Sequence, residues 1–200
     1  MSVSLQKGQK VSLTKENNSL NQILIGLGWD QVQPAKGGFL GGLFASKPAD
    51  IDCDASALLL QNGKLMDKSD IVYFGNLRHK SGAVQHMGDN LTGAGDGDDE
   101  HILVELAKLP QQYDKIVLVV NIYQAVKRNQ NFGMISNAFI RLVDGKTNQE
   151  MCKYNLSENY NGMTAMIFGE VYRHGGEWKF SAIGQGTTDP GLGELIQRYV

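Results

Sequence analysis

The sequence has little cysteine and little proline, and it has no long apolar run and no long basic run. Only two of its 200 residues are cysteine and four are proline. The longest aliphatic runs, Ala57–Leu60 and Ile116–Val120, are far shorter than the roughly 20 residues that span a bilayer, so we expect no transmembrane segment. The first residues lack the basic head and apolar stretch of a secretory signal, which predicts a cytoplasmic protein.

Charge and cysteine spacing exclude two further classes of site. The formal net charge is −2, and no cluster of Lys and Arg supplies a local positive surface, so a nucleic-acid partner is not expected. Cys53 and Cys152 lie far apart without a C-x-x-C spacing or a neighbouring His, which argues against zinc ligands. We expect both to be buried structural thiols, as free cysteines commonly are.

Glycine is abundant, and strand-like segments recur between turn signals. Glycine supplies 24 of 200 residues, about 12% against a usual share of about 7%. Short segments rich in β-branched and aromatic residues predict ten strands. The predicted strands are Lys10–Thr14, Gln22–Trp29, Ala55–Leu60, Ile71–Phe74, Ile102–Leu106, Lys115–Tyr123, Ala138–Val143, Met151–Asn155, Met163–Tyr172 and Trp178–Ile183.

The order of these segments predicts one mainly β domain that spans residues 1–200. Many short strands with glycine-rich turns and little helix favour a two-sheet β-sandwich over an alternating βαβ fold. The nearly continuous apolar run Lys115–Val120 is typical of a central strand covered on both faces. The clearest helical signal lies at the C-terminus, where Asp189 is the expected N-cap and Pro190 the expected first-turn residue.

A glycine-rich segment at about residues 34–47 is predicted to be a loop. It carries Phe39 and Phe44 among four glycines. These apolar side chains either fold back onto the sandwich or dock on a membrane or partner. We favour the fold-back.

An acidic segment is the sharpest local feature of the sequence. Five carboxylates lie between Asp89 and Glu100 with no basic residue among them, interleaved with glycines that permit tight turns. At about 5 Å and an effective dielectric constant near 20, each carboxylate pair repels by about 3 kcal/mol. A bound cation would relieve that repulsion. A solvated surface run is the less favoured alternative.

The acidic segment has the length of an EF-hand loop but not its pattern. Leu91 and Gly93 stand where oxygen ligands are needed, and Ala94 stands where a glycine makes the turn. A phosphate-binding loop is also excluded, because the segment has no Lys and its charge repels phosphate.

A second acidic group precedes the apolar run Ala57–Leu60. In a strand, Asp52 and Asp54 would point to the same face, and Asp30 ends another predicted strand. Loops of a sandwich gather at its ends, so these carboxylates could reach a shared ion. Many hard oxygen ligands on flexible loops favour Ca²⁺ over Mg²⁺.

At these residues the sequence resembles the TerD family of tellurium-resistance and calcium-binding stress proteins. The glycine-rich insert before Asp50 is most similar to the TerZ branch. The matching blocks are Val11-Ser-Leu-Thr-Lys15, Ile25-Gly-Leu-Gly-Trp-Asp30, Ile51-Asp-Cys-Asp-Ala-Ser-Ala57, Gly88-Asp-Asn-Leu-Thr-Gly93, Gly97-Asp-Asp-Glu100, Gly169-Glu-Val-Tyr172 and Trp178-Lys-Phe180.

The resemblance implies a β-sandwich that binds about two Ca²⁺ ions and catalyses no known reaction. It also implies partners among other tellurium-resistance proteins, some of them at the membrane, and leaves the oligomeric state undefined. Cys53 departs mildly from the family pattern, because an apolar residue is expected between the two aspartates. Its side chain is expected to point away from the ion. By motif position, the implied metal ligands are Asp30, Asp52, Asp54, Asp89, Asp96, Asp98, Asp99 and Glu100.

Three functions therefore compete. The leading hypothesis is a non-enzymatic calcium-responsive stress protein whose acidic loops bind ions and order a partner surface. A metal-dependent phosphoester hydrolase is the first alternative, although the four histidines lack ligand spacing and no nucleophile motif is present. The second is a membrane-docking module in which calcium bridges the acidic loops to anionic lipid.

Overall fold

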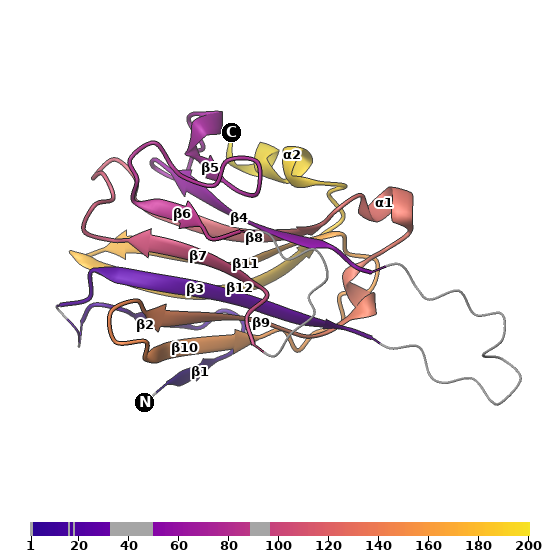
Figure 1. Cartoon of the computed structure of the whole chain (residues 1–200), viewed down its shortest axis with the longest axis horizontal. Helices are drawn as coiled ribbons and strands as arrows, with labels where there is room; N and C mark the ends of the chain where they lie inside the picture. Colours follow the sequence, from indigo (N-terminus) through magenta and orange to yellow (C-terminus); the bar gives the residue numbers. More distant parts are fainter. Residues whose placement is uncertain (1, 16, 18, 33–49, 89–96) are drawn as a thin grey trace, which may run out of the picture.

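Two six-stranded β-sheets pack face to face and form a sandwich, as predicted from the sequence (Figure 1). The computed structural model describes residues 2–15, 17, 19–32, 50–88 and 97–200. The predicted glycine-rich loop at residues 34–47 lies outside these residues. Sheet A has the order β1 (Val3–Leu5), β10 (Glu150–Asn155), β9 (Ile135–Asp144), β3 (Gln22–Gln31), β7 (Glu100–Glu105) and β6 (Val84–His86). Sheet B has the order β2 (Lys10–Ser12), β12 (Glu177–Thr187), β11 (Ala165–His174), β8 (Lys115–Ile122), β4 (Cys53–Leu60) and β5 (Ile71–Val72).

All ten predicted strands are present, and two further strands were missed. The missed strands, β1 and β6, have three residues each. Both are edge strands. Length alone does not explain why they were missed, because the predicted strands β2 and β5 have only three and two residues.

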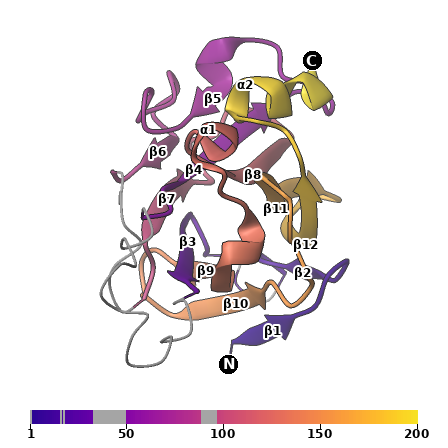
Figure 2. The same cartoon turned by 90° about the vertical axis from the view of Figure 1, so that its right-hand side faces the viewer.

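Short helical segments connect the strands or follow the last one (Figure 2). Within the described residues, no helix is long and apolar enough to span a membrane. The helical segments of the described part are the α-helices α1 (Ala125–Arg128) and α2 (Leu192–Leu195) and the 3₁₀ segments η2 (Lys68–Asp70), η3 (Phe132–Met134) and η4 (Ile196–Tyr199).

The main core fills the space between the sheets. On β3, Ile23, Ile25 and Leu27 point inward, and the alternate residues point outward from sheet A. On β8, Ile116 and Leu118 belong to this core, whereas Val117 and Val119 belong to a second apolar cluster. The continuous apolar run of β8 is therefore explained, because this strand is buried on both faces as predicted.

The C-terminal helix covers the outer face of sheet B. Leu195 is fully buried in the second cluster, which also contains Leu58 and Val119. The predicted helix is present, but the prediction that Asp189 caps it was wrong. The N-cap residue is Gly191, and the Asp189 carboxylate instead pairs with Arg198 at 2.8 Å. An ion pair with a residue of the last turn takes the place of the cap.

Candidate metal centre

The segments that carry the predicted ligands meet at one end of the sandwich. Asp30 lies near the end of β3, Asp54 lies near the start of β4, and Glu100 begins β7. The end of β3 lies beside the start of β7, because the two strands are antiparallel and Leu27 pairs with Glu100. Six of the eight predicted ligands are described by the structure, whereas Asp89 and Asp96 lie outside the described residues.

Glu100 joins the two sheets at this end. Its Oε2 accepts a hydrogen bond of 2.8 Å from the backbone N–H of Ala55 on β4. The same oxygen lies 3.2 Å from His86 Nε2 on β6. Only 1% of the Glu100 side chain is exposed, so this carboxylate lies inside the protein.

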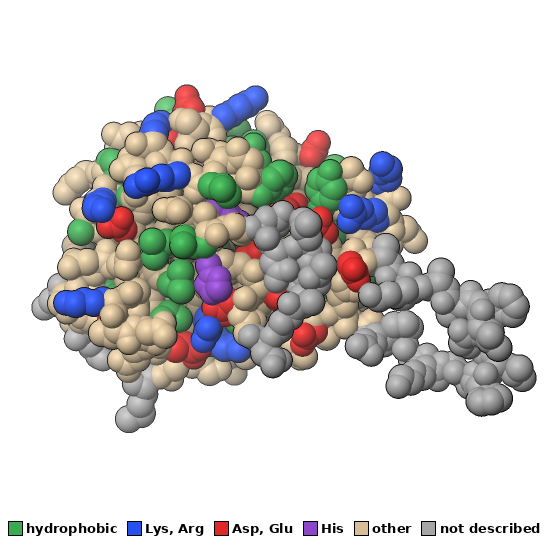
Figure 3. Space-filling model, viewed as in Figure 1, with side chains coloured by type: hydrophobic (Ala, Val, Ile, Leu, Met, Phe, Trp, Pro, Cys, Tyr) green, Lys and Arg blue, Asp and Glu red, His purple; other side chains and the backbone are tan. Residues whose placement is uncertain are grey.

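Asp98 lies over the outer face of sheet A and is held by two basic side chains. Its Oδ1 lies 2.7 Å from Arg141 Nε, and its Oδ2 lies 3.1 Å from His101 Nε2. Burial alone would raise the pKa of Asp98, but the hydrogen bonds from His101 and Arg141 outweigh it and lower the pKa. The space that this carboxylate occupies exists because Gly26 has no side chain. On the face seen in Figure 3, acidic side chains gather close to histidine and Lys or Arg side chains.

Asp99 and Asp30 lie close to Asp98. Asp99 Oδ2 accepts a hydrogen bond of 2.7 Å from the backbone N–H of Trp29. Burial raises the pKa of Asp99, and the negative charges of Asp30 and Asp98 raise it further. A cation beside these three carboxylates would favour the ionised form of Asp99.

The remaining predicted ligands surround Cys53. Burial raises the pKa of this thiol well above its ordinary value, and the charges of Asp54, Asp52, Glu100 and Asp99 add to the shift in that order. Cys53 itself belongs to the main core, so its sulfur does not face the same side of β4 as Asp54. Asp54 Oδ2 accepts a hydrogen bond of 3.3 Å from Asn121 Nδ2.

The donor set fits a hard cation such as calcium. The described candidates offer carboxylate oxygens, and Asn121 adds a buried amide oxygen that has no hydrogen-bond partner in the described part of the chain. Oxygen-rich sets of this kind suit Ca²⁺ better than zinc, which prefers sulfur and nitrogen. Among the described residues, however, no three His, Cys, Asp or Glu side chains converge on a point ready to hold a metal.

Sequence reasoning missed the residues that hold the carboxylates in place. Arg141 on β9 binds Asp98, and Asn137 Nδ2 donates a hydrogen bond of 2.8 Å to Asp30 Oδ2. Asn137 has a φ of 53°, a left-handed conformation that asparagine tolerates better than most residues. It lies where the pairing of β3 and β9 shifts register between Gly28 and Asp30. Bulges of this kind re-aim side chains near functional sites.

A surface hollow of about 720 Å³ adjoins Asp30 on the outer face of sheet A. Phe139, Arg141 and Lys153 are among its lining residues. The Lys153 ammonium lies 3.7 Å from the centre of the Phe139 ring. Apolar, cationic and anionic groups therefore lie together beside the acidic end of the sandwich.

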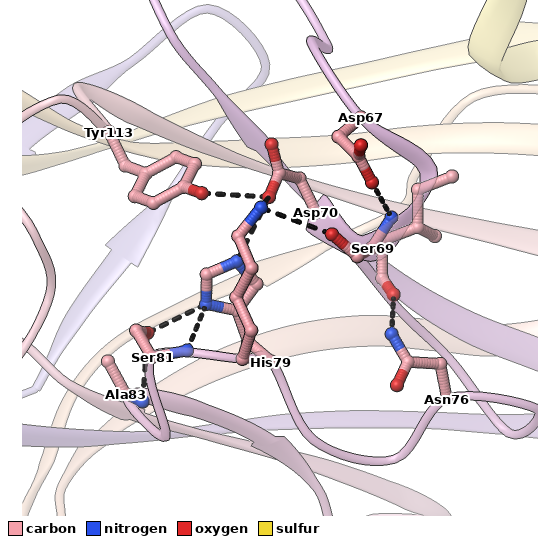
Figure 4. Close-up of polar contacts among 10 residues, drawn as sticks. Asp67, Ser69, Asp70, Asn76, His79, Ser81, Ala83 and Tyr113 are labelled. Atoms are coloured by element: carbon pink, nitrogen blue, oxygen red, sulfur yellow. Dashed lines mark hydrogen bonds and ion pairs between the residues drawn. The ribbon is translucent and has the colours of Figure 1, made fainter.

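A second polar cluster joins the edges of the two sheets (Figure 4). His79 Nε2 lies 3.2 Å from Asp70 Oδ1, and His79 Nδ1 lies 2.7 Å from Ser81 Oγ. The same Asp70 oxygen also accepts hydrogen bonds from Tyr113 at 2.8 Å and Lys80 at 2.7 Å. Asp70 precedes β5, whereas the backbone of His79 pairs with Val84 of β6. We therefore interpret the cluster as a tie between edge strands.

The family model and the most similar relatives agree on one family. The TerD domain family model matches residues 1–199. The stress response protein SCP2 of Bacillus subtilis is 54% identical over 200 residues, covering all of both chains. The tellurium resistance protein TerD of Serratia marcescens is 46% identical, covering 100% of this chain and 97% of that protein. The tellurium resistance protein TerZ of Serratia marcescens is 43% identical, covering 91% of this chain and 89% of that protein, so identity does not favour the TerZ branch.

Solved structures agree on the fold. The crystal structure of a homologue of telluride resistance protein (TerD) from Streptomyces coelicolor has a TM-score of 0.59 at 21% identity. The match covers 84% of this chain and 90% of that one. A second solved structure, of a protein titled as of unknown function, has a TM-score of 0.63 at 24% identity and covers 85% of this chain and 91% of the other.

Proposed function

Since the chain belongs to the TerD family, we propose that it is a non-enzymatic stress-response protein of the tellurium-resistance type that binds about two calcium ions. Relatives named as tellurium resistance and stress response proteins support this assignment. The observation that carries the calcium part is the meeting of carboxylates from β3, β4 and β7 at one end of the sandwich.

In this proposal calcium acts by neutralising charge. The charges of Asp30 and Asp98 raise the pKa of Asp99 on one side, and the charges of Asp52, Asp54 and Glu100 act on Cys53 on the other. Ions bound by these groups would hold together the strand ends at this end of the sandwich. They would also change the charge beside the hollow lined by Phe139 and Arg141. We assign that surface to the binding of a partner protein, which would be another tellurium-resistance protein.

The direct test is a thermal melt of chelator-stripped protein in EGTA, in 1 mM Ca²⁺ and in 1 mM Mg²⁺. An ion at a hundred times its dissociation constant stabilises the native state by about 2.7 kcal/mol. For a domain of this size the melting temperature should then rise by roughly 5 to 11 °C. We expect that rise with Ca²⁺ and little with Mg²⁺. Equal melting curves in EGTA and Ca²⁺ would overturn the proposal.

A matched pair of variants separates calcium binding from general stability. Asp54→Asn removes a candidate ligand charge and should reduce the calcium-induced rise. Asp144→Asn is the control, because Asp144 is similarly buried at 7% exposure but pairs with Ile23 at the opposite end of β3. It should lower the melting temperature and leave the rise caused by calcium unchanged.

Two further assays test the absence of enzymatic and membrane activity. Stripped protein is incubated with generic phosphoesters and Mn²⁺, Mg²⁺ or Ca²⁺, and we expect no turnover. Turnover that disappears in Asp98→Ala would establish the hydrolase alternative instead. Calcium-dependent pelleting with anionic liposomes would likewise establish the membrane-docking alternative if it is lost when Phe39 and Phe44, which lie outside the described residues, are replaced by serine.

A further inference from the structure

Three oxygen-bearing side chains lie together on the outer face of sheet B. On β4, Cys53 and Ala55 face the main core, whereas Leu58 and Leu60 face the second cluster. The pairing of β4 with β8 has no register shift, so Asp54 and Ser56 share the face of Leu58. Asn121 pairs directly with Asp54 and donates its Nδ2 hydrogen bond to that carboxylate. The Nδ2 end of its amide therefore faces Asp54, and turning the amide over would bring Oδ1 to the same place.

Two of these side chains carry buried oxygens that have no hydrogen-bond partner. Ser56 is 1% exposed and Asn121 is 6% exposed, and both Ser56 Oγ and Asn121 Oδ1 lack a partner among the residues that the structure describes. Leaving such an atom buried and unpaired destabilises the native state, because its hydrogen bonds to water are lost and not replaced. Two of them beside one carboxylate therefore indicate that the native protein holds something there.

The chemistry of the three groups favours a cation over a neutral molecule. A carboxylate, an amide oxygen and a hydroxyl are ligands of hard cations, and calcium accepts six to eight such oxygens from side chains, backbone and water. A water molecule would satisfy the two neutral oxygens but would not neutralise the buried carboxylate of Asp54, which is 5% exposed.

We propose that Ser56 and Asn121 are calcium ligands that act with Asp54 on the outer face of sheet B. The inference rests on the proposed calcium binding and adds two ligands that are not carboxylates. It also divides the candidate ligands into two sites. Asp30 and Asp98 lie on the outer face of sheet A, because Ile25 and Leu27 point inward from the same strand as Asp30 and because Asp98 covers Gly26. One ion on each outer face gives the expected two.

The experiment measures calcium stoichiometry by equilibrium dialysis with ⁴⁵Ca²⁺ and affinity by calorimetry on stripped full-length protein. In Ser56→Ala and Asn121→Ala, we expect one class of site to weaken by at least tenfold while the other keeps its affinity. Ser181→Ala is the control, since Ser181 is a buried serine of sheet B on β12, two strands away from β8. It should bind both ions as the unmodified chain does.

Asn121→Asp gives a signature that a purely structural role would not produce. A second carboxylate beside Asp54 should lower the melting temperature in EGTA and enlarge the rise caused by Ca²⁺. If Ser56→Ala and Asn121→Ala bind both ions with unchanged affinity, the inference is wrong and water fills the site. If the unmodified chain binds no calcium, the proposed function itself fails, so the two failures are distinguishable.

Discussion

Replacing Gly26 by alanine should displace Asp98 and break its ion pairs. A Cβ atom at residue 26 would overlap the Asp98 carboxylate, coming within 2.7 Å even of the more distant oxygen. The backbone at Gly26 needs no left-handed conformation, and the three nearest atoms to the added Cβ all belong to Asp98, so the expected strain is the clash with this carboxylate. The substitution therefore tests whether the missing side chain on β3 makes room for the carboxylate.

The contacts of Asp98 set the size of the expected effect. It accepts hydrogen bonds from Arg141 at 2.7 Å and from His101 at 3.1 Å while 1% of its side chain is exposed. Hydrogen bonds to charged groups contribute about 1.5 to 3 kcal/mol each, but Arg141 is 34% exposed, so solvent screening reduces its share. We expect Gly26→Ala to lower the free energy of unfolding by about 2 to 3 kcal/mol, because the displaced carboxylate regains some hydration.

Urea unfolding in EGTA measures this loss without any contribution from bound calcium. Gly193→Ala is the control, because Gly193 is in helix α2 and, among the described residues outside the helix backbone and its chain neighbours, nothing lies within 4 Å of the added atom. It should be neutral or stabilising by up to about 1 kcal/mol. In an Asp98→Ala background, Gly26→Ala should cost much less than in the unmodified chain. An equal cost in both backgrounds would refute the reasoning.

Three other measurements follow from buried groups. Burial lowers the pKa of His79 below its ordinary value, so as the pH is lowered through about 6.5 the unfolded chain takes up a proton before the folded chain does. The free energy of unfolding should therefore decrease as the pH is lowered in this range, and His79→Gln should make that decrease smaller in urea melts. Leu195→Ala should cost about 2 to 5 kcal/mol, because Leu195 is fully buried, whereas Val200→Ala, at a side chain 70% exposed, should change stability by less than about 0.5 kcal/mol. Burial raises the pKa of Cys53, and that of Cys152 to about 12, so both thiols should resist a disulfide reagent until denaturant unfolds the protein; rapid labelling of native protein would contradict this.

Periodicity was enough to predict most of the fold. Apolar alternation and β-branched composition located ten strands, among them the eight that have six or more residues and so bury a whole face. The acidic segments were recognisable because clustered carboxylates are costly without a counter-charge.

The partners of the carboxylates could not be predicted, because they depend on sheet order. Arg141 is 43 residues from Asp98, and the two meet only because β9 and β7 flank β3. The contact of Asp70 with His79 likewise needs the edges β5 and β6 to meet. No local pattern encodes either arrangement.

The pairing of the first strands with the last ones delays folding until synthesis is nearly complete. β1 pairs with β10, so Val3 lies beside Cys152, and β2 pairs with β12, so Val11 lies beside Phe180. Domains dominated by such distant pairings fold in milliseconds to seconds, whereas the ribosome adds only about 5 to 20 residues per second. The N-terminal strands therefore wait without partners while the rest of the chain is made. Chaperone access during that interval should influence the yield of this protein more than its final stability does.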